Sequence, residues 1–333
     1  IKTIAPMNTV TTFDYSPLAQ LLRSTDPDGL ATYYQYDMLG RLMARTHPDA
    51  GIDRYEYDPA GNMVKHINGN GQTIEYRYDY NRLTDIEYPD YPANNVHYTY
   101  GGTGAVDNRA GRIAFQEDAS GWQIFSYGKL GEVTENIRTF ALPNESRPYT
   151  FIMAYNYDSF NRMQQMTYPD GEVVGYFYNS GGMLDSIGGT KMGQAYPYVN
   201  HIAYNKFELK DSVLYGNGTL TTYEYDTLQR LIHLTSQTGT ATAEPMQILD
   251  YDFDDVGNIG KIINSAGILA NGMGGTYNSD YTYDSLYRLK TSAGNWNGNP
   301  NTNFHLSMKY TSNGRICLKS LNNVRTVKNN SYD

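Results

Sequence analysis

The sequence predicts an all-β protein, built as an array of about thirteen antiparallel β-hairpins that extend one shared sheet. Three observations support this fold class. A nine-residue phrase with two tyrosines and an aspartate recurs along the chain, turn residues follow each copy, and the composition favours strands over helices. The 333 residues include 33 Tyr and 32 Gly, and only 18% are charged. Tyrosine and threonine favour strands, whereas glycine, asparagine and aspartate favour turns.

The recurring phrase is clearest at Tyr34–Leu42, which reads YQYDMLGRL. Thirteen copies align on the second aromatic residue of the phrase, and a spacing of 21 residues recurs between them. A period of about 20 to 50 residues is typical of arrays in which each repeat is one supersecondary unit. The aligned residues are Tyr15, Tyr36, Tyr57, Tyr78, Tyr100, Tyr127, Tyr157, Tyr178, Tyr204, Tyr225, Phe253, Tyr283 and Tyr310.

Each copy predicts a strand, a turn and a returning strand. The two tyrosines are two positions apart, so they share one face of a strand. The D-x-x-G that follows fits a type I turn with Asp first and Gly fourth, as at Asp37–Gly40 and Asp58–Gly61. A second turn signal comes some ten residues later, such as PDG at Pro27–Gly29 and Pro169–Gly171. A lone hairpin is marginal in water, so we expect each hairpin to be the ladder partner of the next.

Certain positions of the repeat are expected to hold these hairpins together. The arginine after the turn should bond the turn aspartate or nearby backbone carbonyls, although a solvated arginine explains the pattern equally well. The turn glycine should need a positive φ, so Gly40→Val should harm folding more than Gly101→Val. The positions are Tyr34, Tyr36, Asp37, Gly40, Arg41, Tyr55, Tyr57, Asp58, Gly61, Tyr76, Tyr78, Asp79, Arg82, Tyr155, Tyr157, Asp158, Arg162, Tyr223, Tyr225, Asp226, Arg230, Tyr281, Tyr283, Asp284, Arg288, Gly314 and Arg315.

The pattern Y-x-Y-D-x-x-G-R-L followed by P-D-G resembles the YD repeat of the RHS family. That family includes bacterial Rhs proteins, the C components of insecticidal toxin complexes, and animal teneurins. The resemblance covers essentially the whole chain. It implies a long β-sheet that curves and spirals into a hollow shell or barrel, with residues 1–333 forming a single repeat array within it.

The resemblance also implies a function. In bacterial members the shell encloses a toxic C-terminal domain until delivery, so this chain would be a structural module that carries an effector encoded outside it. Its partners would be the remainder of the shell, the enclosed effector and secretion machinery, and it would be secreted or at the cell surface. The alternative is an adhesion module that binds glycan or protein through insertion loops and rows of tyrosines.

Two features at the ends of the chain qualify the resemblance. Bacterial shells usually end in an RHS-core segment rich in DPxG, and no such segment follows the last repeat, so cleavage is not assigned. The DPDG at Asp26–Gly29 lies at the other end and is an ordinary repeat turn. Ile1 falls within a unit, and Tyr332–Asp333 follows Tyr310 by 22 residues, where the next phrase is due. We therefore expect a piece of a larger protein.

Six longer stretches between repeats are expected to be surface loops, because most are rich in Gly, Asn, Ser or Thr. If this chain recognises a partner, these loops are the best candidates, although tolerated surface loops are the more common explanation. They are Gly101–Gly111, Glu135–Pro148, Gly188–Tyr198, Ser236–Pro245, Ser265–Ser279 and Ser292–Asn303.

Composition argues against several other functions. The net charge of −9 disfavours a nucleic-acid partner, and no apolar run is long enough to span a membrane. Asp250, Asp252 and Asp254 alternate like a calcium loop, but the sixth and twelfth places lack the required Gly and Glu. No catalytic, cofactor or metal residue is predicted, and a hydrolase has no positive support. Neither the lone Cys317 nor the histidine spacing suggests a site; the histidines are His47, His66, His97, His201, His233 and His305.

Overall fold

The computed structural model describes residues 1–5, 9–142, 145, 147–239, 245–269, 272, 274–297, 299–311, 314–322 and 324–327. These residues contain 28 β-strands and one short 3-10 helix, η2 (Pro92–Asn94), so the prediction of an all-β chain is confirmed. The chain divides into two compact units. Unit 1 comprises Ile1–Lys2, Thr11–Gly175 and Thr190–Gln194, and unit 2 comprises Thr3–Val10, Tyr176–Gly189 and Ala195–Asp333.

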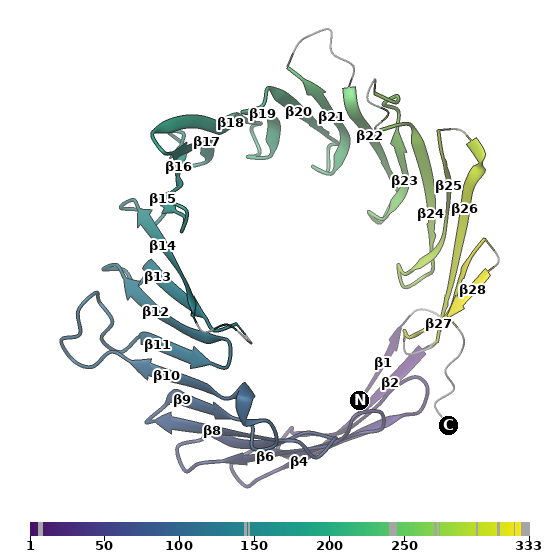
Figure 1. Ribbon diagram of the computed structural model, residues 1–333. Helices are drawn as coiled ribbons and strands as arrows, with labels where there is room; N and C mark the ends of the chain where they lie inside the picture. The colour runs from purple at the N-terminus through teal and green to yellow at the C-terminus, as the bar shows by residue number, and fades with distance from the viewer. Residues whose placement is uncertain are drawn as a thin grey trace. The chain divides into compact units, whose positions relative to one another are not determined.

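Unit 1 is a curved band of strands in which each strand pairs antiparallel with the one before it (Figure 1). The prediction of consecutive hairpins is therefore confirmed here. Its strands are β3 (Leu21–Thr25), β4 (Ala31–Tyr36), β5 (Leu42–His47), β6 (Gly51–Tyr57), β7 (Met63–Ile67), β8 (Thr73–Asp79), β9 (Arg82–Glu87), β10 (Val96–Tyr100), β11 (Ile113–Asp118), β12 (Gly121–Tyr127), β13 (Val133–Phe140), β14 (Tyr149–Tyr157) and β15 (Met163–Thr167), with parts of β1 (Lys2–Ala5), β2 (Thr9–Tyr15) and β16 (Val173–Tyr178).

Unit 2 is built in the same way, from β18 to the last described strand. Its strands are β17 (Leu184–Lys191), β18 (Gln194–Tyr204), β19 (Lys210–Tyr215), β20 (Thr219–Tyr225), β21 (Leu231–Thr238), β22 (Pro245–Phe253), β23 (Ile259–Asn264), β24 (Tyr277–Tyr283), β25 (Leu289–Trp296), β26 (Asn299–Tyr310), β27 (Ile316–Leu321) and β28 (Val324–Val327). The tip of the β17–β18 hairpin belongs to unit 1.

The tight turn of the repeat is a type I turn followed by a bulge. At the β4–β5 turn the N–H of Gly40 donates to the carbonyl of Asp37 over 3.1 Å, and Gly40 has a φ of 83°. The register then shifts, so that Tyr36 lies opposite Leu42 after Gln35 lies opposite Ala44. A glycine in the left-handed region after a type I turn is a common hairpin connection.

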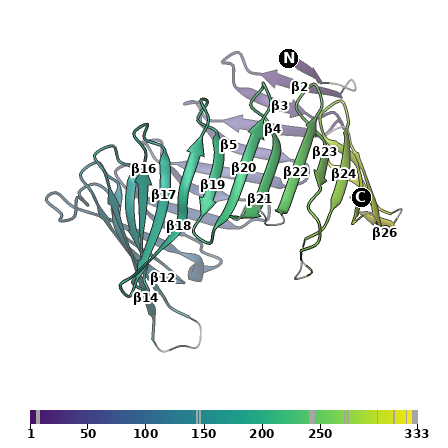
Figure 2. The same cartoon turned by 90° about the horizontal axis from the view of Figure 1, so that it is seen from above.

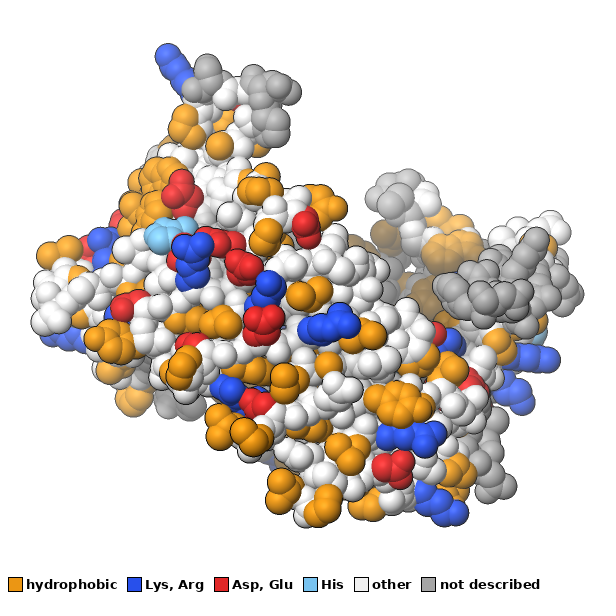
Figure 3. Space-filling view, turned by 90° about the horizontal axis from the view of Figure 1, so that it is seen from below, with side chains coloured by type: hydrophobic (Ala, Val, Ile, Leu, Met, Phe, Trp, Pro, Cys, Tyr) orange, Lys and Arg blue, Asp and Glu red, His pale blue; other side chains and the backbone are white. Residues whose placement is uncertain are grey.

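Within each unit, side chains contact those of neighbouring strands in the same sheet, and few of them are buried. Among the described residues, the buried hydrophobic side chains are Val174, Ile202, Val213, Leu249 and Ala266. On the face in Figure 3, apolar side chains are scattered among charged groups of both signs. Because so few apolar side chains of the described residues are buried, contacts between neighbouring hairpins must carry much of the stability.

Several stretches expected to be loops are instead longer hairpins. The expectation fails at 188–198 and 292–303, where β17–β18 and β25–β26 continue as strands around short turns. It fails in part at 135–148, because β13 continues to Phe140. Threonine, tyrosine and asparagine occur in these stretches, and such residues can also form a strand that is exposed to solvent on both faces. The stretch 236–245 lies partly outside the described residues.

The 101–111 insertion is folded back onto the next hairpin. Asn108 donates its side-chain amide to the carbonyl of Tyr127 (2.9 Å), and Arg109 Nε donates to the carbonyl of Phe125 (2.7 Å). A Cβ on Gly101 would lie 2.4 Å from the carbonyl oxygen of Arg109. A valine at Gly101 would therefore meet backbone, so the structure gives no reason to expect Gly101→Val to be milder than Gly40→Val, and that comparison stays a prediction.

Candidate functional site

The recurring chemistry of the repeat begins inside the tight turn, where several copies have an aspartate and an arginine four residues later. Asp37 Oδ1 accepts the N–H groups of Leu39 and Arg41, each over 2.9 Å. Its Oδ2 accepts Arg41 Nε over 2.7 Å. Both carboxylate oxygens are thus used, one to bind the turn backbone and the other to bind the arginine side chain.

The same arginine reaches the next hairpin. Arg41 Nη1 donates to the carbonyl of Asp58 over 2.9 Å, and its guanidinium lies 4.9 Å from the ring centroid of Tyr57. The Tyr57 hydroxyl donates back to the carbonyl of Leu42 over 2.9 Å. We call this arrangement of Asp37, Arg41 and Tyr57 the inter-repeat clip, because it joins two hairpins at one edge of the sheet.

The aspartate–arginine part of the clip recurs in both units. In Asp158–Arg162, Asp226–Arg230 and Asp284–Arg288, the arginine Nε again lies 2.7 Å from the aspartate Oδ2. Arg230 lies 4.6 Å from the ring centroid of Phe253, and Arg288 lies 4.4 Å from that of Tyr310. The cation–π contact therefore tolerates Phe or Tyr in the following repeat.

The tyrosine part of the clip also recurs, again with its hydroxyl donating to a carbonyl of the preceding repeat. The pattern is not visible in the sequence, because it joins residues of two hairpins. The further pairs are Tyr78–Met63 (2.9 Å), Tyr127–Ile113 (2.6 Å), Tyr204–Leu184 (2.7 Å), Tyr225–Lys210 (2.9 Å), Tyr283–Ile259 (2.9 Å) and Tyr310–Leu289 (2.8 Å).

Repeats that depart from the sequence pattern keep parts of the clip. Asn62 replaces the arginine after Gly61 and donates its amide to Asp58 Oδ2 (2.8 Å) and to the carbonyl of Tyr80 (3.2 Å). Arg82 forms an ion pair with Asp79 and lies 5.3 Å from the ring centroid of Tyr100. Before Gly314 and Arg315, Thr311 takes the aspartate position and its hydroxyl accepts the Arg315 N–H over 3.1 Å.

The first tyrosines of the phrase lie on the same strand face as the second ones and are partly covered. Burial raises the pKa of Tyr55, Tyr76 and Tyr223. The Tyr55 ring stacks on His66, with centroids 4.8 Å apart. The remaining members of this row are Tyr34, Tyr155 and Tyr281.

The turn aspartates are held in the charged form. Hydrogen bonding from the backbone N–H of Arg41, followed by the guanidinium, keeps the pKa of Asp37 below its ordinary value. The same cause lowers the pKa of Asp158 and of Asp226. The lowered pKa keeps these three aspartates ionised, as acceptors for the turn N–H groups and the guanidinium.

Four of the six histidines bond an aspartate on the preceding or following strand. The pairs are His66–Asp53 (3.1 Å), His97–Asp85 (2.7 Å), His201–Asp185 (2.9 Å) and His233–Asp250 (2.6 Å). Asp53 also receives Arg45 Nη2 over 2.7 Å. These pairs escaped sequence reasoning because they depend on strand register rather than on spacing along the chain.

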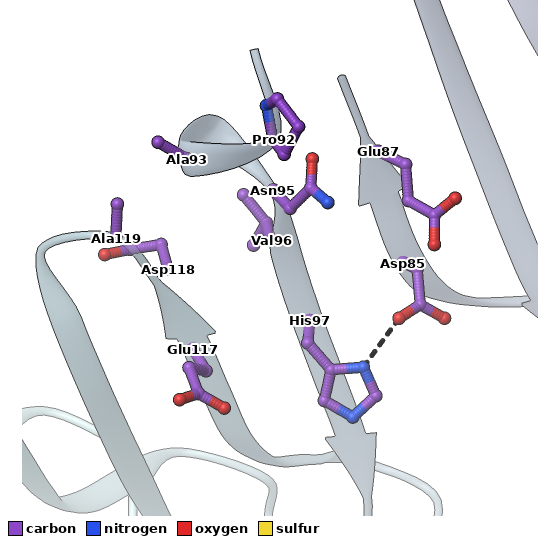
Figure 4. Close-up of a pocket in the computed structure, with 10 residues that line it drawn as sticks. All are labelled: Asp85, Glu87, Pro92, Ala93, Asn95, Val96, His97, Glu117, Asp118 and Ala119. Carbon is purple, nitrogen blue, oxygen red and sulfur yellow. Dashed lines mark hydrogen bonds and ion pairs between the residues drawn. The ribbon is translucent and has the colours of Figure 1, made fainter. Parts of the chain in front are cut away.

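One of these pairs borders an acidic groove of about 400 Å³ in unit 1. Asp85 and Glu87 project from β9, Glu117 and Asp118 from β11, and His97 stands between them on β10 (Figure 4). Within the described part of the chain, no group of three or more His, Cys, Asp or Glu side chains could hold a metal ion. The alternating Asp250 and Asp254 are engaged with His233 and with turn N–H groups. We assign no chemistry to the groove.

The described residues also contain no helix long and apolar enough to cross a membrane. Hairpins joined by repeated clips define a structural β-repeat array. The chain belongs to the Teneurin YD-shell family, whose sequence profile matches residues 30–333, and the predicted membership of the RHS/YD-repeat family is confirmed.

Known proteins resemble this chain in sequence or in fold. The toxin subunit YenC1 of Yersinia entomophaga is 27% identical over 198 residues, which cover 53% of this chain and 19% of that protein. The crystal structure of TcdB2-TccC3-Cdc42 matches 97% of this chain with a TM-score of 0.80 at 19% identity. The Tc holotoxin pore of Photorhabdus luminescens matches 95% with a TM-score of 0.79. This chain spans 17–19% of the length of these proteins.

Proposed function

We propose that this chain is a wall segment of a YD-repeat shell that encloses and carries a C-terminal effector encoded outside residues 1–333. The observation that supports the proposal most strongly is the inter-repeat clip. It occurs in both units. Its aspartate, arginine and tyrosine side chains bond to the hairpins themselves, so they are not available to bind a substrate. The chain is then a non-enzymatic component, and its two units are parts of one repeat array.

The comparisons with known proteins favour a structural component of a shell. One relative is a toxin subunit, and the solved structures that share the fold contain TccC3. By this analogy the partners are the rest of the shell and the enclosed effector, and the assembly is secreted or displayed at the cell surface. A wall must resist opening, and the clips meet that need by tying each hairpin to the next.

Protease protection in the parent protein tests the proposal. The C-terminal effector should resist trypsin while the wall is intact, and should become cleavable when clips are broken by Arg41→Ala and Arg230→Ala together. A matched control is Arg77→Ala, which removes an exposed ion pair with Glu87. Equal cleavage of the effector in all three proteins would contradict enclosure. Saturable binding of the isolated chain to a glycan array would instead favour the adhesion alternative.

A further inference from the structure

One joint of unit 1 has different residues at the clip positions. In the β12–β13 turn, Gly128 takes the position of the aspartate and Glu132 takes the position of the arginine. The turn backbone is nevertheless the same: the N–H of Gly128 donates to the carbonyl of Glu132 (2.8 Å), as the N–H of Asp37 does to that of Arg41 (2.9 Å). β12 and β14 belong to neighbouring hairpins, which are joined through β13 (Figure 2). The joint therefore differs in its side chains and keeps the backbone of the repeat.

The side chain of Glu132 folds back over its own turn. A Cβ on Gly128 would lie 1.8 Å from Glu132 Oε1 and 2.9 Å from Glu132 Oε2. The carboxylate therefore occupies the space that an aspartate side chain would take at position 128, and the glycine makes room for it. A carboxylate thus remains at this turn, although it comes from the other end of the turn and no arginine accompanies it.

This carboxylate has an oxygen that nothing in the chain satisfies. Among the described residues, Glu132 Oε2 is the one buried side-chain oxygen or nitrogen without a hydrogen-bond partner. Asp37, by contrast, uses both of its oxygens. Because a buried carboxylate without a donor costs stability, such a group in a native fold calls for an explanation. Glu132 Oε1 is not buried, so a cation can approach the carboxylate from solvent.

Other joints without an arginine satisfy their carboxylates within the chain. Asn62 donates its side-chain amide to Asp58 Oδ2 over 2.8 Å. Asn258 donates in the same way to Asp254 Oδ2, also over 2.8 Å. The unsatisfied carboxylate at Glu132 is therefore not a general result of losing the arginine.

The next hairpin presents the backbone carbonyl that a clip arginine contacts. The carbonyl of Asp58 accepts the N–H of Gly61 (3.1 Å) and also Arg41 Nη1 (2.9 Å). The equivalent carbonyl beside Glu132 is that of Asp158. It accepts the N–H of Asn161 over 3.0 Å, and no side-chain donor among the described residues bonds to it. Its second acceptor position thus remains available for a donor.

The next hairpin also presents the aromatic ring of the clip. Tyr157 is the equivalent of Tyr57, whose ring centroid lies 4.9 Å from the guanidinium of Arg41. Within the part of the chain that the structure describes, no arginine or lysine lies over the partly exposed ring of Tyr157. Burial raises the pKa of Tyr157, and smaller contributions come from Tyr155 and from the negative charge of Glu132. Carboxylate and ring are therefore close enough to act on one ligand.

We propose that Glu132, the carbonyl of Asp158 and the ring of Tyr157 form a binding site for the guanidinium of an arginine side chain supplied by another polypeptide. The three groups are those that hold Arg41 in the regular clip. A planar guanidinium can donate to a carboxylate and a carbonyl while its face lies on a ring, which a lysine ammonium cannot do. The site does not depend on the proposed enclosure of an effector, because it is built from one joint of unit 1.

Titration of the whole chain with N-acetyl-arginine amide tests the site directly. The tyrosines are isotope-labelled for nuclear magnetic resonance, and the Tyr157→Phe variant identifies the resonance of Tyr157. We expect this resonance to shift saturably with the arginine amide, and N-acetyl-lysine amide to bind more weakly. A Tyr157 resonance that does not move, or equal affinity for the two amides, would overturn the proposal.

Glu132→Gln removes the charge of the carboxylate and keeps its shape. The variant should bind the arginine amide at least about tenfold more weakly, because a charge-assisted hydrogen bond is lost. The control is Glu117→Gln, which removes an exposed carboxylate of the same unit and should leave the affinity unchanged. An equal loss of affinity in both variants would reduce the effect to general attraction by negative charge and refute the site.

Sedimentation at increasing protein concentration identifies where the arginine comes from. Self-association of the parent that Glu132→Gln abolishes would support the site and place the arginine on a second copy of this chain. A parent that remains monomeric and binds the arginine amide would support the site with a different polypeptide as the source.

A double variant supplies the arginine from the chain itself. Gly128→Asp combined with Glu132→Arg recreates the residue pair of Asp158 and Arg162, in which the arginine Nε lies 2.7 Å from the aspartate Oδ2. We expect its urea midpoint to lie above that of the parent, and the response of Tyr157 to the arginine amide to disappear, because the new guanidinium occupies the ring. Undiminished binding of the arginine amide by the folded double variant would overturn the proposal.

Discussion

The hydroxyl of Tyr57 lies 2.9 Å from the carbonyl oxygen of Leu42, fifteen residues earlier in the chain. Leu42 starts the returning strand of one hairpin and Tyr57 ends the first strand of the next. Since Arg41 also donates to the carbonyl of Asp58, the two hairpins exchange hydrogen bonds in both directions. Because the bonds run in both directions, the clip connects two repeats and does not only stabilise a single turn.

Tyr57→Phe should destabilise the chain by about 1 kcal/mol, because a partly buried carbonyl loses its donor while the ring contact with Arg41 remains. Urea unfolding followed by tyrosine fluorescence or circular dichroism measures the change. Tyr80→Phe is the matched control, since Tyr80 is 88% exposed at a turn. If the two variants have the same unfolding midpoint, the hydroxyl of Tyr57 contributes nothing.

Arg41→Lys should lower the unfolding midpoint nearly as much as Arg41→Ala. A lysine ammonium can pair with Asp37, but it cannot also present a flat face to Tyr57 and a second donor to the carbonyl of Asp58. The control is Arg77→Lys at the exposed Arg77–Glu87 pair, where lysine should be tolerated. A midpoint for Arg41→Lys close to that of the parent would show that charge alone matters here.

The free energy of unfolding should decrease at acidic pH, because the turn aspartates become protonated. The folded pKa of Asp37, Asp158 and Asp226 is lowered, so their contribution is present above the unfolded value of about 3.9. It is lost as the pH falls from there through the lower folded pKa. We expect the triple Asp→Asn variant to be less stable than the parent at pH 6 and to approach it near pH 2.

Urea unfolding of both proteins from pH 6 to pH 2 measures this difference. Charged groups outside the turns affect the two proteins alike, so they cancel in the comparison. A constant difference between the parent and the triple variant across the whole range would show that the carboxylate charge of these residues is not involved.

The repeat geometry could be predicted because its signals are local. Two tyrosines two apart, an aspartate and a glycine at φ 83° all act within one hairpin, so Tyr34–Gly40 is sufficient to infer a strand and its turn. The partners of Arg41 were expected in outline, as an aspartate or nearby carbonyls. The structure adds that it contacts both together with the next aromatic ring.

The contacts between hairpins could not be predicted, because they depend on how two hairpins align. The carbonyl that receives Tyr57 and the aspartate beside His97 are set by register, which no residue spacing reveals. Polar composition also misled at 292–303: threonine and asparagine suggested a loop, yet their backbone continues the ladder.

Gly40→Ala should destabilise the chain by about 1 kcal/mol, because Gly40 has a φ of 83°, which an L side chain resists. Space is not the cause, since the nearest atom to a Cβ there is the Gln20 amide nitrogen at 3.4 Å. Gly102→Ala is the control, because a Cβ at Gly102 meets nothing within 4 Å and its φ is not positive. Urea unfolding should move the midpoint in the first variant and leave it in the second. Equal midpoints would mean that the turn accommodates an alanine in the left-handed region without cost, and the glycine of the YD phrase would then lose its conformational explanation.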